Sequence, residues 1–116
     1  MKSSFATPPG LERELRDTVA QGVYETGLTH DPTNLSLLNN LGLSLALSGQ
    51  HDRAISLLSE LVNDPSATPQ IRQNLALAYG LAGNFEAARA VGAIDLPPGA
   101  VESNVNFYKF ALESLR

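Results

Sequence analysis

The chain of 116 residues lacks cysteine and contains few basic residues. Without cysteine it can form no disulfide, and it offers no thiolate ligand to a metal ion. Its eight basic residues form no cluster and stand against 12 acidic ones, which leaves a formal net charge of −4. Because nucleic-acid binding depends on a basic surface, this charge balance predicts that the protein has no nucleic-acid partner.

Long apolar runs are also missing. The longest apolar stretch, residues 41–47, is interrupted by Gly42 and Ser44 and is too short to cross a bilayer. Residues 1–10 contain no apolar run of the kind a signal peptide needs, and the Pro-Pro-Gly group at their end marks a flexible leader before the first helix. We therefore expect that no part of this chain inserts directly into a membrane. The 116 residues are either a fragment of a longer protein or a chain that starts with a native terminal capping helix.

Groups suited to catalysis are scarce. The only two histidines, His30 and His51, each lie beside an aspartate at an expected helix boundary, and two histidines without a third ligand do not make a metal site. Ser44 lies inside an expected helix, without the strained turn that presents a nucleophilic serine. Since no base is placed next to a nucleophile, we predict a protein that is not an enzyme and needs no metal or cofactor.

What the chain does contain is an internal repeat. Six pairs of identical residues lie 34 positions apart: Asn40 and Asn74, Leu41 and Leu75, Leu43 and Leu77, Leu47 and Leu81, Gly49 and Gly83, and Ala54 and Ala88. A fixed period that preserves the order of small and large residues is typical of stacked helical hairpins. The sequence therefore predicts an all-α repeat protein whose main role is to bind a partner.

The block 35–68 resembles the tetratricopeptide repeat, whose period is also 34. The resemblance rests on the positions Leu38, Leu41, Gly42, Leu45, Gly49, Ala54 and Leu58. A second, partial copy starts at Pro69, and half a copy precedes the block, so the resemblance covers residues 16–92. It implies an α-helical solenoid of antiparallel hairpins with about six helices, the last of them a C-terminal capping helix.

The expected helices span 11–29, 34–48, 52–62, 68–82, 84–92 and 98–114. As domains, we expect the leader 1–10 and a single repeat domain, 11–116. That domain divides into a half repeat or N-terminal capping helix (11–33), a repeat (34–67), a repeat with a short second helix (68–96) and the capping helix (97–116).

Small residues and turn residues fall where such hairpins need them. Gly42 and Ala76 would let paired helices approach closely. Gly49 and Gly83 would close the first helix of each hairpin in a left-handed conformation, and Asp52 and Asn84 would cap the returning helices. In the first helix, near four-residue spacing predicts one apolar face that contains Leu11, Leu15, Val19, Val23 and Leu28.

The last helix should bury a stripe formed by Val101, Val105, Tyr108 and Leu112, as a lid over the second hairpin. Phe107 and Phe110 flank this stripe, and two alternatives are open for them. They complete the core of the lid, or one of them, more readily Phe107, lies in the binding groove.

The residues 71–83, 95–98 and 102–108 are similar to the C-terminal part of TadD-type proteins, which are repeat proteins of bacterial Flp (tight-adherence) pilus systems. This resemblance implies a lipoprotein on the periplasmic side of the outer membrane that assists assembly of the secretin ring. The lipidated cysteine of that family is absent here. A protein without the pilus role would instead be cytoplasmic.

Stacking as in the family would place the first helix of each hairpin on a concave face. The predicted partner-binding residues on this face are Asn39, Asn40, Leu43, Leu47, Gln70, Gln73, Asn74, Leu77, Leu81 and Phe107. Leucines beside side-chain amides suit a peptide whose backbone is held by Asn and Gln. Alternatively, each amide bonds to its neighbouring helix. Lysines that would clamp a terminal carboxylate are missing from this face.

Two other functions are open. Two copies could associate through the helix at 11–28, which would make the segment an oligomerisation module. The segment could also stabilise a longer protein without binding a ligand of its own.

Overall fold

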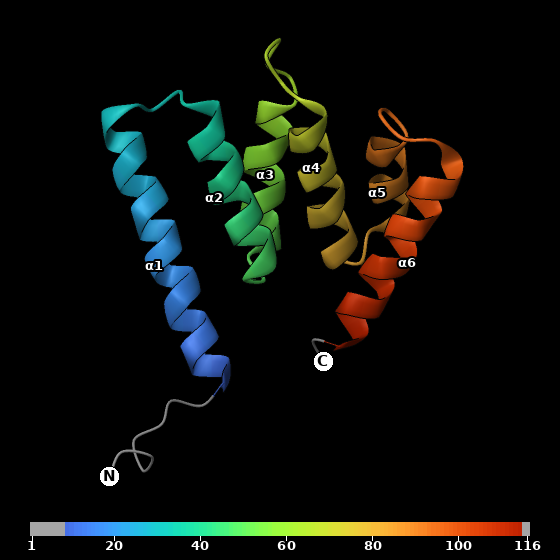
Figure 1. The fold of residues 1–116 in the computed structure, drawn as a ribbon, viewed down its shortest axis with the longest axis horizontal. Coiled ribbons are helices and arrows are strands. Elements are labelled where there is room, and N and C mark those ends of the chain that lie inside the picture. The colour runs from blue at the N-terminus through green and yellow to red at the C-terminus, as the bar shows by residue number, and fades with distance from the viewer. Residues whose placement is uncertain (1–8, 115–116) are drawn as a thin grey trace.

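The computed structural model describes residues 9–114, which form six α-helices and no strand. The helices are α1 (Pro9–His30), α2 (Leu35–Leu47), α3 (His51–Leu61), α4 (Pro69–Leu81), α5 (Phe85–Gly92) and α6 (Pro98–Ser114). Successive helices run antiparallel in a row, and α3 and α5 lie behind the layer formed by α2, α4 and α6 (Figure 1). The all-α prediction is confirmed, and each helix begins and ends within two residues of its expected bounds.

Both hairpins turn on a glycine in the left-handed region. Gly49 has φ 87° and Gly83 has φ 86°, and no other residue of the described chain has positive φ. The Gln50 amide donates to the Leu45 carbonyl (2.9 Å) and the Asn84 amide to the Tyr79 carbonyl (2.9 Å), which closes each helix end in the same way. The predicted role of the two glycines is thus confirmed.

Side-chain caps start three of the helices. Asn34 Oδ1 accepts from the Leu37 amide (3.0 Å), Thr68 Oγ1 from the Ile71 amide (3.3 Å) and Asn84 Oδ1 from the Ala87 amide (3.2 Å). The predicted cap at Asp52 is wrong. Since α3 begins at His51, directly after the tight turn, Asp52 lies in the first helical turn. Gln50 occupies the cap position, and its side chain makes no capping hydrogen bond to an amide of α3.

Two glycines allow close helix crossings. A Cβ atom on Gly42 would lie 2.7 Å from Cγ of the fully buried Leu58, so α2 and α3 meet there without space for a side chain. A Cβ atom on Gly80 would overlap the ring of Tyr108, which joins α4 to α6 in the same manner. The sequence predicted the first crossing but not the second.

The core consists of two clusters of buried residues. The first lies between α2, α3 and α4 and is made of Leu41, Leu45, Ala46, Ala54, Leu58, Leu61, Ile71, Leu75 and Ala78. The second joins α5 to α6 through Ala88, Val101, Val105 and Tyr108. The predicted stripe of α6 is therefore buried at three positions, while Leu112 is half-buried.

Helix α1 presents a different face to the rest of the molecule than expected. Tyr24 and Leu28 pack against the first core cluster, but Val19 and Val23 are 66% and 62% exposed. The step of five residues from Val23 to Leu28 turns about 140° around the helix, which separates these side chains. The prediction of one shared face is thus wrong for the described side chains, and those of Leu11 and Leu15 lie outside them.

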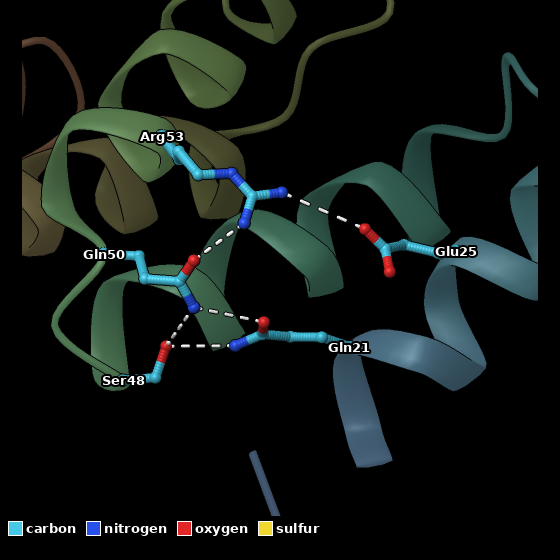
Figure 2. A network of polar contacts seen from close by, with 5 residues as sticks. All are labelled: Gln21, Glu25, Ser48, Gln50 and Arg53. Carbon is cyan, nitrogen blue, oxygen red and sulfur yellow. Dashed lines mark hydrogen bonds and ion pairs between the residues drawn. The ribbon is translucent and has the colours of Figure 1, made fainter. Parts of the chain in front are cut away.

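A polar network attaches α1 to the turn between α2 and α3 (Figure 2). Gln21 Nε2 donates to Ser48 Oγ (3.0 Å), and Gln50 Nε2 donates to Gln21 Oε1 (3.1 Å). Arg53 donates to Gln50 Oε1 (2.7 Å) and lies 3.9 Å from the Glu25 carboxylate. Side-chain amides therefore hold this end of the row, in addition to the contacts of Tyr24 and Leu28.

Candidate functional site

The helices α2, α4 and α6 run in the same direction in one layer, so their C-terminal halves lie at the same end of that layer (Figure 1). A hollow of about 310 Å³ lies between these C-terminal halves. Its lining residues are Leu47 of α2, Leu77 and Leu81 of α4, and Phe107, Phe110, Ala111 and Ser114 of α6. We call this hollow the apolar groove.

Large apolar side chains line the apolar groove without being buried in it. Leu47 is 48% exposed, Phe107 is 60% exposed and Phe110 is 70% exposed. Three such side chains around one hollow form the kind of exposed apolar patch that marks a contact site. Because the surface is concave, an entering side chain would meet apolar atoms on several sides.

The exposure of both phenylalanines follows from the packing of α6. Tyr108 occupies the space left by Gly80, and burial raises the pKa of its phenol. Phe107 lies edge-on to the Tyr108 ring, with 6.3 Å between ring centroids and an angle of 69°. The alternative in which the phenylalanines complete the lid core is therefore wrong. The buried stripe is filled by Val101, Val105 and Tyr108.

The structure separates the ten predicted partner-binding residues into three groups. The apolar groove is lined by four of them, Leu47, Leu77, Leu81 and Phe107. Phe110, which was not among the ten, lines the groove as well. Asn40 and Gln70 are exposed at other levels of α2 and α4, and Leu43 is half-buried. The remaining three, Asn39, Gln73 and Asn74, are at least partly buried.

Two of the buried amides join neighbouring helices. Asn39 is only 8% exposed, and its Oδ1 accepts a hydrogen bond of 2.8 Å from Asn74 Nδ2. This bond connects α2 to α4, as expected from the alternative that each amide bonds to its neighbouring helix. It satisfies buried polar atoms that would otherwise destabilise the fold.

Gln73 lies beside an ion pair rather than in the apolar groove. Arg72 donates to both carboxylate oxygens of Asp95 at 2.8 Å, and its hydrogen bonds lower the pKa of Asp95 while Asp95 raises that of Arg72. The buried Gln73 amide also lowers the pKa of Asp95, although neither of its polar atoms makes a well-directed hydrogen bond in the described chain. This cluster ties the loop after α5 to the start of α4.

A larger hollow of about 490 Å³ lies along α2 and α3, lined by Leu41, Leu45, Asp52, Arg53, Ser56, Leu57 and Glu60. Its rim carries charges of both signs, and Leu41 and Leu45 are core residues with exposures of 8% and 2%. An incoming group would therefore meet solvated charges beside the apolar surface, whereas the apolar groove is lined almost entirely by apolar side chains. For this reason we take the apolar groove as the candidate site.

Two further features of the described residues, 9–114, bear on function. Among the described side chains, which are those of residues 16–114, no group of three or more His, Asp or Glu is arranged to hold a metal ion. Within residues 9–114, no helix combines the length and the apolar character that crossing a bilayer requires.

Comparison with known protein families gives a match to part of the chain. A tetratricopeptide repeat family model matches residues 23–56, which comprise the end of α1, all of α2 and the first turns of α3. No curated protein and no solved structure matches the chain, and no homologue confirms the resemblance to TadD-type proteins. The family match and the row of antiparallel helices together support a tetratricopeptide repeat protein.

Proposed function

We propose that the chain is a non-enzymatic scaffold that binds a segment of a partner protein in the apolar groove. The observation that carries this proposal is the set of exposed large apolar side chains, Leu47, Phe107 and Phe110, around one hollow of the layer α2, α4 and α6. Helical repeat proteins use the extended concave surfaces of their stacks for binding.

The amides contribute unequally to this proposal. Asn39 and Asn74 already bond to each other across α2 and α4. Asn40 and Gln70 are exposed and free of that role, so they are the amides available to a partner's backbone. Assembly of a bacterial Flp/Tad pilus is the cellular setting that the sequence resemblance suggests for such a partner.

Affinity capture from the source organism tests the proposal, followed by binding measurements with the purified partner. Phe107→Ser should weaken binding by at least about tenfold, because large aromatic side chains dominate interface energies. Ile94→Ser is the matched control, since Ile94 is 64% exposed but lies outside the apolar groove. Equal affinity of both variants for the partner would contradict the proposal.

A test of the amides separates their two roles. Asn40→Ala should leave thermal stability unchanged and weaken partner binding modestly, whereas Asn74→Ala should lower stability because it leaves Asn39 buried and unpaired. If Asn40→Ala has no effect on binding, the partner is held by the apolar groove alone.

Self-association through α1 is the second candidate function. It is favoured by the exposure of Val19 (66%) and Val23 (62%), which lie one turn apart on the outer helix of the row. Two copies would bury these valines in an interface that contains the same residues on both sides. Solution mass measured over a range of concentrations, with Val19→Ser/Val23→Ser as the comparison, distinguishes this function from partner binding.

A further inference from the structure

The apolar groove contains no charged group of its own. None of its lining residues is ionisable. The other predicted residues of the concave face, all on α2 and α4, are uncharged as well. A charged side chain or a free carboxylate entering this hollow would lose hydration and gain no ion pair in return.

The three helices that form the apolar groove contain two cations within their described residues, Arg72 and Lys109, and both are engaged elsewhere. Arg72, which precedes Gln73, holds Asp95 with two hydrogen bonds of 2.8 Å. Lys109, between Tyr108 and Phe110, places its Nζ 5.3 Å from the centroid of the Phe85 ring. Neither cation is therefore available to neutralise an acidic ligand in the apolar groove.

The size of the hollow limits what it takes. At about 310 Å³ it lies at the lower end of the range for ligand sites, about 300–1,000 Å³. This volume suits one or two large side chains rather than a whole helix. Phe107 and Phe110 on one wall and Leu77 and Leu81 on another provide apolar contact for such an anchor.

Resting on the proposed function, we infer that the occupant is an internal, uncharged segment of the partner protein, anchored by a leucine- or phenylalanine-sized side chain. Its binding is governed by apolar burial and by neutral hydrogen bonds to the peptide backbone. The overall charge of −4 therefore does not select the ligand, and a free chain terminus is not required.

The test is a selection from a library of random peptides whose two ends are blocked, performed with the full chain. The selected peptides should contain a large apolar residue flanked by uncharged ones. Affinity for a selected peptide should not fall between about 0.1 and 1 M NaCl, over which the Debye length shrinks from about 10 to about 3 Å. Phe107→Ala should weaken this affinity at least about tenfold, and Ile94→Ala should not.

Three outcomes would overturn the inference and differ in what they say of the proposed function. If the selected peptides are charged, or if their affinity falls steeply with salt yet still depends on Phe107, the neutral occupant is wrong and the scaffold function stands. If the chain forms a concentration-dependent dimer that Phe107→Ala abolishes, the occupant of the groove is a second copy of the chain and not a segment of another protein. If no peptide binds, or if binding ignores Phe107, the proposed function itself fails.

Discussion

The helices at the two ends of the row, α1 and α6, are held in place by different interactions. Helix α6 buries Val101, Val105 and Tyr108, and the Tyr108 ring fills the space above Gly80. Helix α1 leaves Val19 and Val23 in solvent, and of its described side chains it packs only the partly buried Tyr24 and Leu28 against the core. It is also joined to the turn between α2 and α3 by the Gln21 network (Figure 2). Apolar burial in a tightly packed contact stabilises more than partly exposed hydrogen bonds do. The end that carries the proposed site is therefore the more rigidly held one.

Alanine substitutions at two glycines should give opposite effects at the two ends. Gly80→Ala should lower the free energy of unfolding by roughly 1–3 kcal/mol, because its Cβ atom would overlap Tyr108 and displace α6. Gly22→Ala in α1 meets no atom within 4 Å and should raise it by about 0.5–1 kcal/mol, since alanine is the better helix former. Urea unfolding measures both. A Gly80→Ala protein as stable as the wild type would disprove the close crossing.

Matched valine truncations give the next largest contrast. Val105 is 1% exposed, so Val105→Ala should lower the free energy of unfolding by about 2 kcal/mol through lost burial and the cavity left behind. Val23→Ala removes the same atoms from a side chain that is 62% exposed and should change it by less than about 0.5 kcal/mol. Thermal and urea unfolding check the pair. A large effect at Val23 would show that α1 is covered in solution, as the self-association candidate requires.

The stability of the α6 end should depend on acid. Arg72 lowers the pKa of Asp95 in the folded protein, so the pair contributes stability above the ordinary carboxyl pKa of 3.8 and loses it as the pH falls through the lowered value. Asp95→Asn should remove this component of the acid dependence and leave the remainder. The measurement is the urea midpoint of both proteins from neutral pH to below the ordinary carboxyl pKa. Curves that stay parallel throughout would refute the assignment.

The smallest expected effect concerns α1. Gln21→Ala removes the bonds to Ser48 and Gln50, but the existing hydrogen bond from Gln50 Nε2 to Ser48 Oγ (3.2 Å) can remain. The global free energy of unfolding should fall by only about 0.5–1 kcal/mol. Hydrogen exchange of the α1 amides should accelerate while that of α4 stays unchanged, because α1 can open locally. Acceleration spread equally over both helices would show that α1 is no weaker than the rest.

The local features were predictable because they depend on neighbouring residues. The period of 34 residues, the six helices, the left-handed glycines and the cap at Asn84 all follow from spacing and turn chemistry. The cap at Asp52 failed because the cap position in both hairpins is the residue directly after the turn glycine, which is Asn84 after Gly83 but Gln50 after Gly49. The apolar residues of α1 could be identified but not assigned to a buried or exposed side, because that depends on how α1 packs against the first core cluster.

Only the tertiary structure decided which concave residues are accessible. The repeat period placed Asn39 and Asn74 on one face, but the separation of α2 and α4 determines that they bond to each other. Helix α6 lies outside the repeat, so its rotation follows from Tyr108 entering the space above Gly80, and this exposes Phe107 and Phe110. The sequence by itself determined the helices and their order, because those depend on local backbone energetics. The apolar groove depends on how three separate helices are placed against one another, which no local pattern encodes.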